Sequence, residues 1–375
     1  MTDSSLFAFQ PSAVDYSLGV EVEVQLLDPA TWELAPLAQS FLAALPPAER
    51  KTIKGEFLQS MIEVATPVCP DPPSAATELR RLLGRAQENA AQAKAIAFFG
   101  SLHPASPWRW QRVSDRPRYQ EIAAELQVCG QRLITQGLHV HIGITDADRA
   151  ARLCDCLRPH LPTLLALSAA SPFYEGADTG FHSYRAVLLA DLPRSGVPST
   201  FGGWSRCQQL LAAFRAAGHI QTIREVWWDV RPHCELGTVE VRICDIPMTF
   251  GELTGLVALV HALAVTLDQA EEPPLHLPHE AMLANRWAAA RHGLEAAFIA
   301  NASRPAATVC REAASRLFDL VEPAARAYDG WPLIEHLAQT MADHGTGAER
   351  LRSMHKAHNG SFAELLRAWQ KGFWQ

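Results

Sequence analysis

Three short segments decide the fold: Gly19-Val20-Glu21-Val22-Glu23-Val24, Gly137-Leu138-His139-Val140-His141-Ile142-Gly143 and Gly237-Thr238-Val239-Glu240-Val241-Arg242-Ile243-Cys244. In each segment, apolar residues alternate with ionisable ones. Because successive side chains of a strand point to opposite faces, each segment is predicted to be a strand with one apolar and one polar face. The polar faces would carry Glu21 with Glu23, His139 with His141, and Glu240 with Arg242. Carboxylates, imidazoles and a guanidinium on three strands predict a concave surface that binds metal ions and an anion.

The composition favours a packed globular protein and argues against a nucleic-acid-binding or membrane-spanning one. The chain has 375 residues, of which 48% are hydrophobic and 19% charged, and its formal net charge is -7. These values are typical of a packed globular protein and argue against nucleic-acid binding. No stretch approaches the ~18 consecutive apolar residues of a membrane span, and the N-terminus lacks a signal-peptide pattern, so we expect a cytoplasmic protein without a membrane partner. The eight cysteines include no Cys-x-x-Cys pair, which predicts free, mostly buried thiols.

Periodicity and chain-breaking residues predict an α+β fold. We expect strands at residues 17–27, 59–66, 96–102, 137–145, 226–231 and 238–244, and helices at 77–97, 146–168 and 250–267. Residues 107–119 and Ser171–Arg185 are predicted to be loops, the second of them long and functional. Amphipathic helices follow from about His279. The chain is therefore predicted to hold a catalytic sheet domain over residues 1–270 and a helical C-terminal region over 271–375 packed on the same domain.

Paired carboxylates are the first candidates for chemistry. Glu21 and Glu23 would repel each other, and a divalent cation such as Mg²⁺ or Mn²⁺ removes that cost; the alternative is an exposed strand face with two acids. Glu63 lies among apolar residues and needs a partner or a wet face, so it is a candidate metal ligand or catalytic acid. Strict alternation places Glu56 on the opposite face, unless the strand begins after it or carries a bulge.

The other two strands supply imidazoles and a cation. His139 and His141 can share a metal ion or a phosphate, although a single histidine is more often structural. Glu240 and Arg242 either form an ion pair worth about 0.2–1 kcal/mol, or bind a metal and an anion respectively.

Arg231 and Arg185 are further candidates for anion binding. The sequence contains no P-loop, no Rossmann glycine pattern, no Gly-x-Ser-x-Gly elbow and no His-Glu-x-x-His. A bound nucleotide would therefore have to be held by metal ions and arginines.

Six motifs in order resemble the glutamate–cysteine ligase type 2 family of bacterial carboxylate–amine ligases. They are GVEVEVQLLD, MIEVATPVC, GLHVHIG, ALSAASPFYEGADTGFHSYR, WWDVRP and GTVEVRICD, and the resemblance covers residues 17 to about 350. That family is similar in fold to glutamine synthetase catalytic domains, so the resemblance implies a curved antiparallel sheet with flanking helices.

The resemblance also implies roles for the site residues. Those implied to bind metal are Glu21, Glu23, Glu63, His139 and Glu240. Those implied to act in catalysis are Arg242, Glu63 and Arg231, and those expected to contact ATP are His141, Arg242 and Arg185. Val22 replaces a glutamate common in the family but points away from this face, whereas Ala170 replaces a common asparagine and would affect substrate recognition.

The implied reaction is an ATP-dependent ligation. A carboxylate would attack the γ-phosphate of ATP with Mg²⁺ or Mn²⁺ bound, and an amine would capture the acyl phosphate, with glutamate and cysteine as the implied substrates. The Ser171–Arg185 segment would contact the amino-acid substrate. A metal-dependent hydrolase or phosphotransferase with the same ions, or an inactive binding homologue, remains an alternative, and the alanine-rich helices allow a homodimer.

Overall fold

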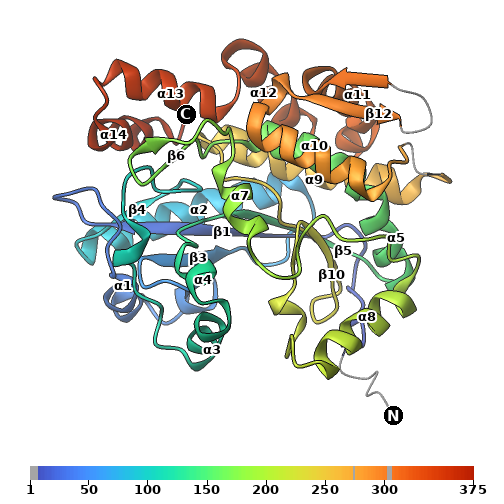
Figure 1. Cartoon of the computed structure of the whole chain (residues 1–375), viewed down its shortest axis with the longest axis horizontal. Coiled ribbons are helices and arrows are strands. Elements are labelled where there is room, and N and C mark those ends of the chain that lie inside the picture. The colour runs from blue at the N-terminus through green and yellow to red at the C-terminus, as the bar shows by residue number, and fades with distance from the viewer. Residues whose placement is uncertain (1–6, 273–274, 302–305) are drawn as a thin grey trace.

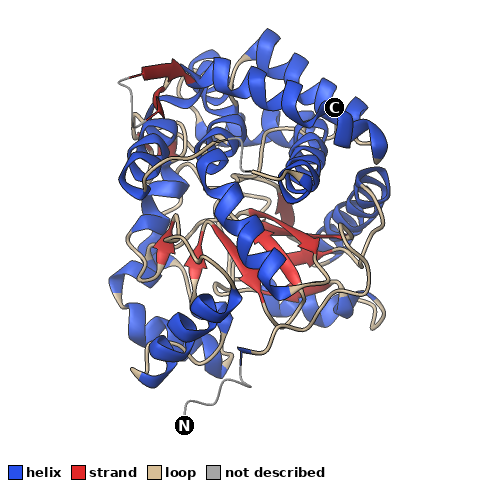
Figure 2. Ribbon diagram, turned by 90° about the vertical axis from the view of Figure 1, so that its right-hand side faces the viewer, coloured by secondary structure: helices blue, strands red, loops and turns tan. Residues whose placement is uncertain are grey.

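A computed structural model describes residues 7–272, 275–301 and 306–375. Its centre is a seven-stranded sheet with the order β10-β11-β5-β1-β3-β2, with β4 beside β1, and every pairing is antiparallel (Figure 2). The strands are β1 (Leu18–Leu27), β2 (Ile53–Gly55), β3 (Met61–Ala65), β4 (Ile96–Phe98), β5 (Leu138–Gly143), β10 (Val230–His233) and β11 (Thr238–Val241). The predicted α+β class with an antiparallel sheet is confirmed.

Helices surround the sheet (Figure 1). They are α1 (Ala38–Ala44), α2 (Pro72–Gln92), α3 (Pro117–Leu126), α4 (Val128–Gln131), α5 (Ala147–Leu157), α6 (Leu161–Ser168), α7 (Tyr184–Ala190), α8 (Trp204–Ala216), α9 (Phe250–Gln269), α10 (His279–His292), α11 (Cys310–Ala327), α12 (Trp331–His344), α13 (Gly347–Ala357) and α14 (Phe362–Gly372). Alternate β1 residues Val20, Val22 and Val24 are buried in the core that the sheet shares with α2, α5 and α9. Their polar neighbours are thereby directed to the other face.

Short elements complete the chain. They are the strands β6 (Phe173–Tyr174), β7 (Ala177–Asp178), β8 (Ser195–Gly196), β9 (Trp227–Trp228), β12 (Ala297–Asn301) and β13 (Ala306–Val309), and the 3₁₀ turns η2 (Glu49–Lys51), η3 (Trp108–Trp110), η4 (Arg158–His160), η5 (Ile223–Glu225) and η6 (Gly293–Glu295).

Helix α9 is the centre of the helical layer. It packs against α2 and α5 from the first part of the chain and against α11 and α12 from the C-terminal region. By length and composition it could cross a membrane, but 89% of its apolar window is buried inside the protein, as in a core helix. A capping box between Thr249 and Glu252 fixes its start directly after the strand that carries Glu240.

Three predicted elements differ from the structure because of proline. The helix expected at 77–97 begins at Pro72, since Asp71 caps the amide of Ser74 and proline fits a first helical turn. The helix expected at 146–168 is divided by the 3₁₀ turn η4, which contains Pro159 and is followed by Pro162 at the start of α6. The loop expected at 107–119 holds η3 and the proline-led start of α3.

Two predicted loop or helical regions contain small hairpins. The Ser171–Arg185 segment holds the pair β6–β7, which turns at Glu175 and Gly176 with positive φ angles of 48° and 80°. In the C-terminal region, β12 pairs with β13 among the expected helices.

Candidate active site

The sheet register brings the predicted polar residues onto one face. Glu21 lies opposite His139, and Glu240 lies opposite both His141 on β5 and Arg231 on β10. On the other side of β1, Glu23 lies opposite Glu63. The polar face expected from three separate segments is therefore continuous from β10 to β3.

A cavity of about 440 Å³ lies over this face. Its lining includes all nine residues singled out from the sequence, namely Glu21, Glu23, Glu63, His139, His141, Arg185, Arg231, Glu240 and Arg242. Residues of α3, the end of α7 and the η5 segment form the opposite wall. An ion pair of 3.7 Å between Arg118 and Glu225 joins α3 to η5, and one of 2.9 Å between Arg132 and Asp191 joins the end of α4 to the end of α7.

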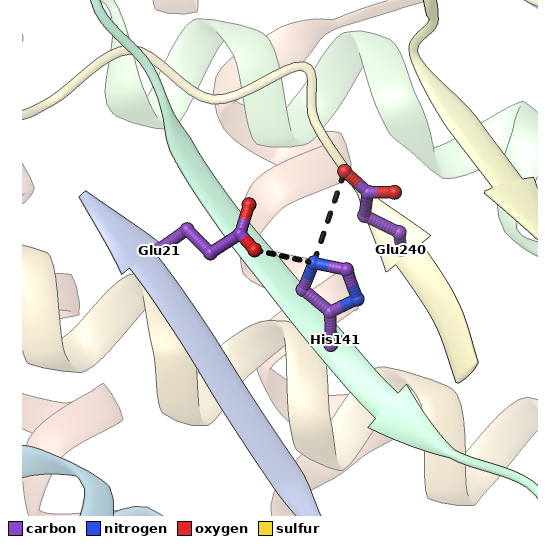
Figure 3. Close-up of side chains that lie close together, drawn as sticks. All are labelled: Glu21, His141 and Glu240. Atoms are coloured by element: carbon purple, nitrogen blue, oxygen red, sulfur yellow. Dashed lines mark ion pairs between the residues drawn. The ribbon is translucent and has the colours of Figure 1, made fainter. Parts of the chain in front are cut away.

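Glu21, His141 and Glu240 form a candidate metal centre (Figure 3). One ligand atom from each lies within 4.8 Å of the others. His141 Nε2 is 3.6 Å from Glu21 and 3.8 Å from Glu240, and this buried nitrogen has no hydrogen-bond partner among the residues that the structure describes. Its Nδ1 lies 2.9 Å from Thr238 Oγ1, so a proton on Nδ1 would leave the Nε2 lone pair for a metal. Two carboxylates and an imidazole fit Mg²⁺ or Mn²⁺.

The fully buried Glu240 is held as an anion by two arginines. Arg231 donates from Nε at 2.6 Å and from Nη2 at 3.3 Å, and Arg242 donates to Oε1. Burial opposes ionisation of Glu240, but these cations hold its pKa well below the usual range. The remaining Arg231 nitrogen donates to the carbonyls of Ile223 and Val226, so Arg231 positions Glu240, whereas Arg242 keeps more of its side chain at the cavity.

The other half of the site, on the β1–β3 side, holds three acids, Glu23, Glu63 and Glu56, with few positive charges to balance them. Burial and the neighbouring Glu56 raise the pKa of Glu23 to about 7. Burial, together with Glu21, Glu56 and Glu23, raises the pKa of Glu63 well above its ordinary value. Burial also raises the pKa of Glu56, although Tyr119 donates to it at 2.6 Å. This half needs a cation before all of its acids can ionise.

Glu56 reaches the site because β3 begins at Met61, after the chain has turned from β2. Because Glu56 precedes the strand, the alternation of side chains along β3 does not fix the face on which Glu56 lies.

The two histidines differ in their surroundings. Burial and Arg242 lower the pKa of His139 to about 4, and its Nδ1 is 3.4 Å from Glu21. His141, by contrast, has its pKa raised, because Glu240 and Glu21 outweigh the effect of burial. His141, expected to contact the nucleotide, therefore belongs to the candidate metal centre, and His139 lies beside it.

Arg185 is committed to the protein. Its terminal nitrogens donate to the carbonyls of Ile243 and Arg242 at 3.1 Å each, and it lies 3.7 Å from Asp245. A Cβ on Gly137 would lie 2.2 Å from Arg185 Nη2, so this guanidinium fits only beneath a glycine. These bonds support the strand end that carries Arg242. Arg185 also lines the cavity, and the nucleotide contact expected for it stays a prediction.

Two expectations about substrate recognition stay predictions, and the lining of the cavity bears on both. Of residues 171–185, all of which the structure describes, only Arg185 lines the cavity, because Ser171 and Ser183 bind the buried Asp245. Ala170 lies outside the lining, and its Cβ faces Gly347, where an added Cβ would lie 2.7 Å away. The observed contact of Ala170 is a packing contact with Gly347, and its effect on substrate choice stays a prediction.

Two lining residues next to the charged groups, Tyr119 and His233, were missed from the sequence. Tyr119 approaches from α3, which is distant in sequence from the sheet. His233 lies opposite Thr238, its ring is 5.8 Å from that of His141, and burial lowers its pKa to about 4. His233 could have been predicted, because it lies two residues after Arg231 on β10 and therefore shares its face.

Comparison with known proteins agrees with this geometry. The model of glutamate-cysteine ligase family 2 matches residues 17–368. A curated protein of Mycolicibacterium paratuberculosis, named provisionally as a glutamate–cysteine ligase 2, is 33% identical over 355 residues, covering 94% of this chain and 93% of its own. A protein of Gloeobacter violaceus with the same provisional name is 36% identical over 297 residues, 78% of this chain and 79% of its own.

A solved structure is similar in fold. The glutamate–cysteine ligase of Francisella tularensis, solved in complex with AMP, has a TM-score of 0.71 at 14% sequence identity and covers 97% of this chain and 89% of its own. The family match over most of the chain, supported by the curated relatives and this fold, shows that the chain belongs to glutamate-cysteine ligase family 2 and is a carbon–nitrogen ligase.

Proposed function

We propose that the protein uses ATP to join a carboxylate to an amine, with glutamate as the acid and cysteine as the amine. The observation that carries this proposal is the convergence of Glu21, His141 and Glu240 within 4.8 Å in a cavity whose walls also hold Arg242. Family membership supports the same reaction. The sheet provides both the acids for divalent metal ions and a cation for a transferring phosphoryl group.

Glu21, His141 and Glu240 would hold one Mg²⁺ or Mn²⁺, and Glu23, Glu63 and Glu56 would hold a further ion beside it, with His139 next to Glu21. A bound divalent ion would neutralise negative charge on the phosphates of ATP. Arg231 would keep Glu240 in place, and Arg242 would contact the transferring phosphoryl group. Residues of the sheet would therefore supply most of the positioning and charge stabilisation that phosphoryl transfer requires.

The reaction would proceed in two steps. An oxygen of the substrate carboxylate bonds to the γ-phosphorus of ATP while the bond to the β,γ-bridging oxygen breaks, giving an acyl phosphate and ADP. The neutral amine then bonds to the acyl carbon, inorganic phosphate leaves, and the amine proton passes to solvent or phosphate. The cavity would keep the acyl phosphate away from bulk water.

The test is ADP release with Mg²⁺ and ATP in the presence of glutamate, cysteine, both or neither. ADP formed with both substrates, together with a γ-glutamyl amide, is the expected result. Hydrolysis of ATP that no carboxylate or amine accelerates would overturn the ligase assignment and favour a hydrolase. Release with the acid alone would indicate either a phosphotransferase or an acyl phosphate formed without the amine, and only the second would give a γ-glutamyl amide when cysteine is added.

A further inference from the structure

The proposed reaction gives the helical C-terminal region no part at the site. Among the residues after Arg242 that the structure describes, none lines the cavity. One buried side chain of this region nevertheless reaches the edge of the site. Arg286 of α10 donates to the carboxylate of Asp229, from Nε at 2.6 Å and from Nη2 at 3.2 Å. Such a two-bond contact fixes the orientation of both partners.

Asp229 lies directly before β10 and belongs to the edge of the sheet. Its carbonyl accepts the backbone N–H of Arg242 at 2.8 Å, next to the last paired residues of β10 and β11. Its own N–H donates to the carbonyl of Gly196 at 2.8 Å. Asp229 therefore holds one backbone group of Arg242, while Arg286 holds the carboxylate of Asp229.

The other backbone group of Arg242 is held from α7. The carbonyl of Arg242 accepts from Arg185 Nη2 at 3.1 Å. Arg185 is followed by Ala186, whose carbonyl accepts from Nη1 of Arg286 at 3.3 Å. Arg286 thus bonds to both of the segments that hold the backbone of Arg242. These contacts close on themselves, and we call them the Arg242 ring: Arg242, Asp229, Arg286, Ala186 and Arg185.

The ion pair in this ring is protected from water. Asp229 is 5% exposed and Arg286 is 8% exposed. Burial alone would lower the pKa of Arg286, but the neighbouring Asp229 carboxylate outweighs this effect and raises it. A lysine at position 286 would keep the charge, but its ammonium group lacks the planar fork that makes two parallel bonds to one carboxylate and a third to a carbonyl.

We propose that Arg286 is a positioning residue, which acts through Asp229 and α7 to hold Arg242 where it meets the transferring phosphoryl group. This inference rests on the proposed contact of Arg242 and gives the C-terminal region a part in the reaction. The side chain of Arg242 also donates to Glu240. The ring fixes the backbone from which both that bond and the phosphoryl contact extend, so that Arg242 is oriented before the nucleotide binds.

The test compares two nucleotides that differ in the phosphoryl group that Arg242 would contact. Calorimetry with Mg²⁺ would measure Kd for ADP and for a non-hydrolysable ATP analogue, in the wild type and in Arg286→Lys. The ratio of the two Kd values should shift against the ATP analogue by on the order of tenfold, while Kd for ADP changes less than about twofold. An unchanged ratio, or an equal weakening of both nucleotides, would overturn the inference.

Arg149→Lys is the matched control. Arg149 lies on α5, outside the cavity lining, and also bonds to two acids, Asp15 at 2.8 Å and Asp268 at 2.5 Å. Thermal unfolding should show that both lysine variants fold, and Arg149→Lys should keep the wild-type ratio of Kd values. The same shift of this ratio in both variants would show a general effect of loosening the fold and would overturn the role of Arg286.

A double variant tests whether Arg286 acts through Asp229. Asp229→Asn with Arg286→Lys should shift the ratio little more than the more affected of the two single variants, because both changes break the same contact. Asp229 itself lines the cavity. Shifts that add would therefore show that Asp229 contacts the nucleotide independently of Arg286, and would overturn the ring.

These binding measurements require no turnover, so they separate this inference from the proposed function. A shifted ratio in Arg286→Lys supports the positioning role even if ADP release refutes the ligase. In the ligase assay, Arg286→Lys should lower kcat by on the order of tenfold, with KM for glutamate and cysteine nearly unchanged. A higher KM for glutamate at an unchanged kcat would assign the ring to the acid substrate and overturn the inference while leaving the ligase intact.

Discussion

The two halves of the site solve the same electrostatic problem in different ways. On the β10–β11 side, Glu240 is paired with Arg231 and Arg242, so its charge is balanced by the protein itself. On the β1–β3 side, Glu23 and Glu63 face each other across the strands, and their pKa values are raised by burial and by the neighbouring acids. The first half is organised before any ligand binds, and the second needs a cation to reach its working charge state.

The largest expected effect follows from neutralising the balanced half. Glu240→Gln should lower kcat by roughly 10³-fold, because it removes a metal ligand and leaves two arginines without their counter-charge. The same variant should lose about 3–5 kcal/mol of unfolding free energy. ADP release and urea denaturation would measure the two losses.

Glu235→Gln is the matched control, since Glu235 forms an exposed ion pair with Arg224. Near-wild-type turnover in Glu240→Gln would refute the role assigned to Glu240.

Neutralising the unbalanced half should change stability in the opposite direction. Glu63→Gln removes a carboxyl group that is costly to ionise, so at pH 8 without metal the variant should be more stable than wild type by on the order of 1 kcal/mol. Its activity should nevertheless fall by roughly 10²-fold. Thermal unfolding in EDTA and ADP release would be measured together.

Glu33→Gln, at an exposed position, controls for the loss of one surface acid and should change neither quantity. A Glu63→Gln protein that is less stable than wild type in EDTA would show that Glu63 is compensated within the folded chain.

The comparison also predicts a dependence on pH. Glu23 ionises near 4.5 in the unfolded chain but has a pKa of about 7 in the folded protein, so the metal-free fold loses stability as pH rises between these values. The lowered pKa values of Glu21 and Glu240 act oppositely, adding stability that is lost as pH falls below about 4.5. Mg²⁺ should therefore raise Tm more at pH 8 than at pH 5.5. An equal rise at both pH values would contradict this.

The smallest effect on catalysis is expected outside both halves. Ala170→Asn restores the residue common in the family, but the position faces Gly347 and not the cavity. Overpacking should cost about 1–3 kcal/mol of stability, while KM for each substrate changes less than twofold. A large shift in substrate preference would show that the position acts on recognition.

Local sequence patterns predicted the sheet and most of its polar face, because alternation fixes the facing of Glu21 or Glu240 within one strand. Such patterns do not describe what approaches from elsewhere. Tyr119 reaches Glu56 from α3, and Arg185 reaches the carbonyl of Arg242 from 57 residues away in sequence. The pattern of the Ser171–Arg185 segment likewise did not indicate that two of its serines, Ser171 and Ser183, turn inward to Asp245.

The burial of the cysteines has a practical consequence for spectroscopy. All eight thiols are free, and seven of them are buried, whereas Cys129 is partly accessible. Cys129 lies on α4, between the cavity-lining residues Leu126 and Leu133 in the sequence. A thiol-reactive fluorophore added to the unmodified protein should therefore label Cys129 first. Its emission would then report changes in the environment of α4, for example when a ligand enters the cavity.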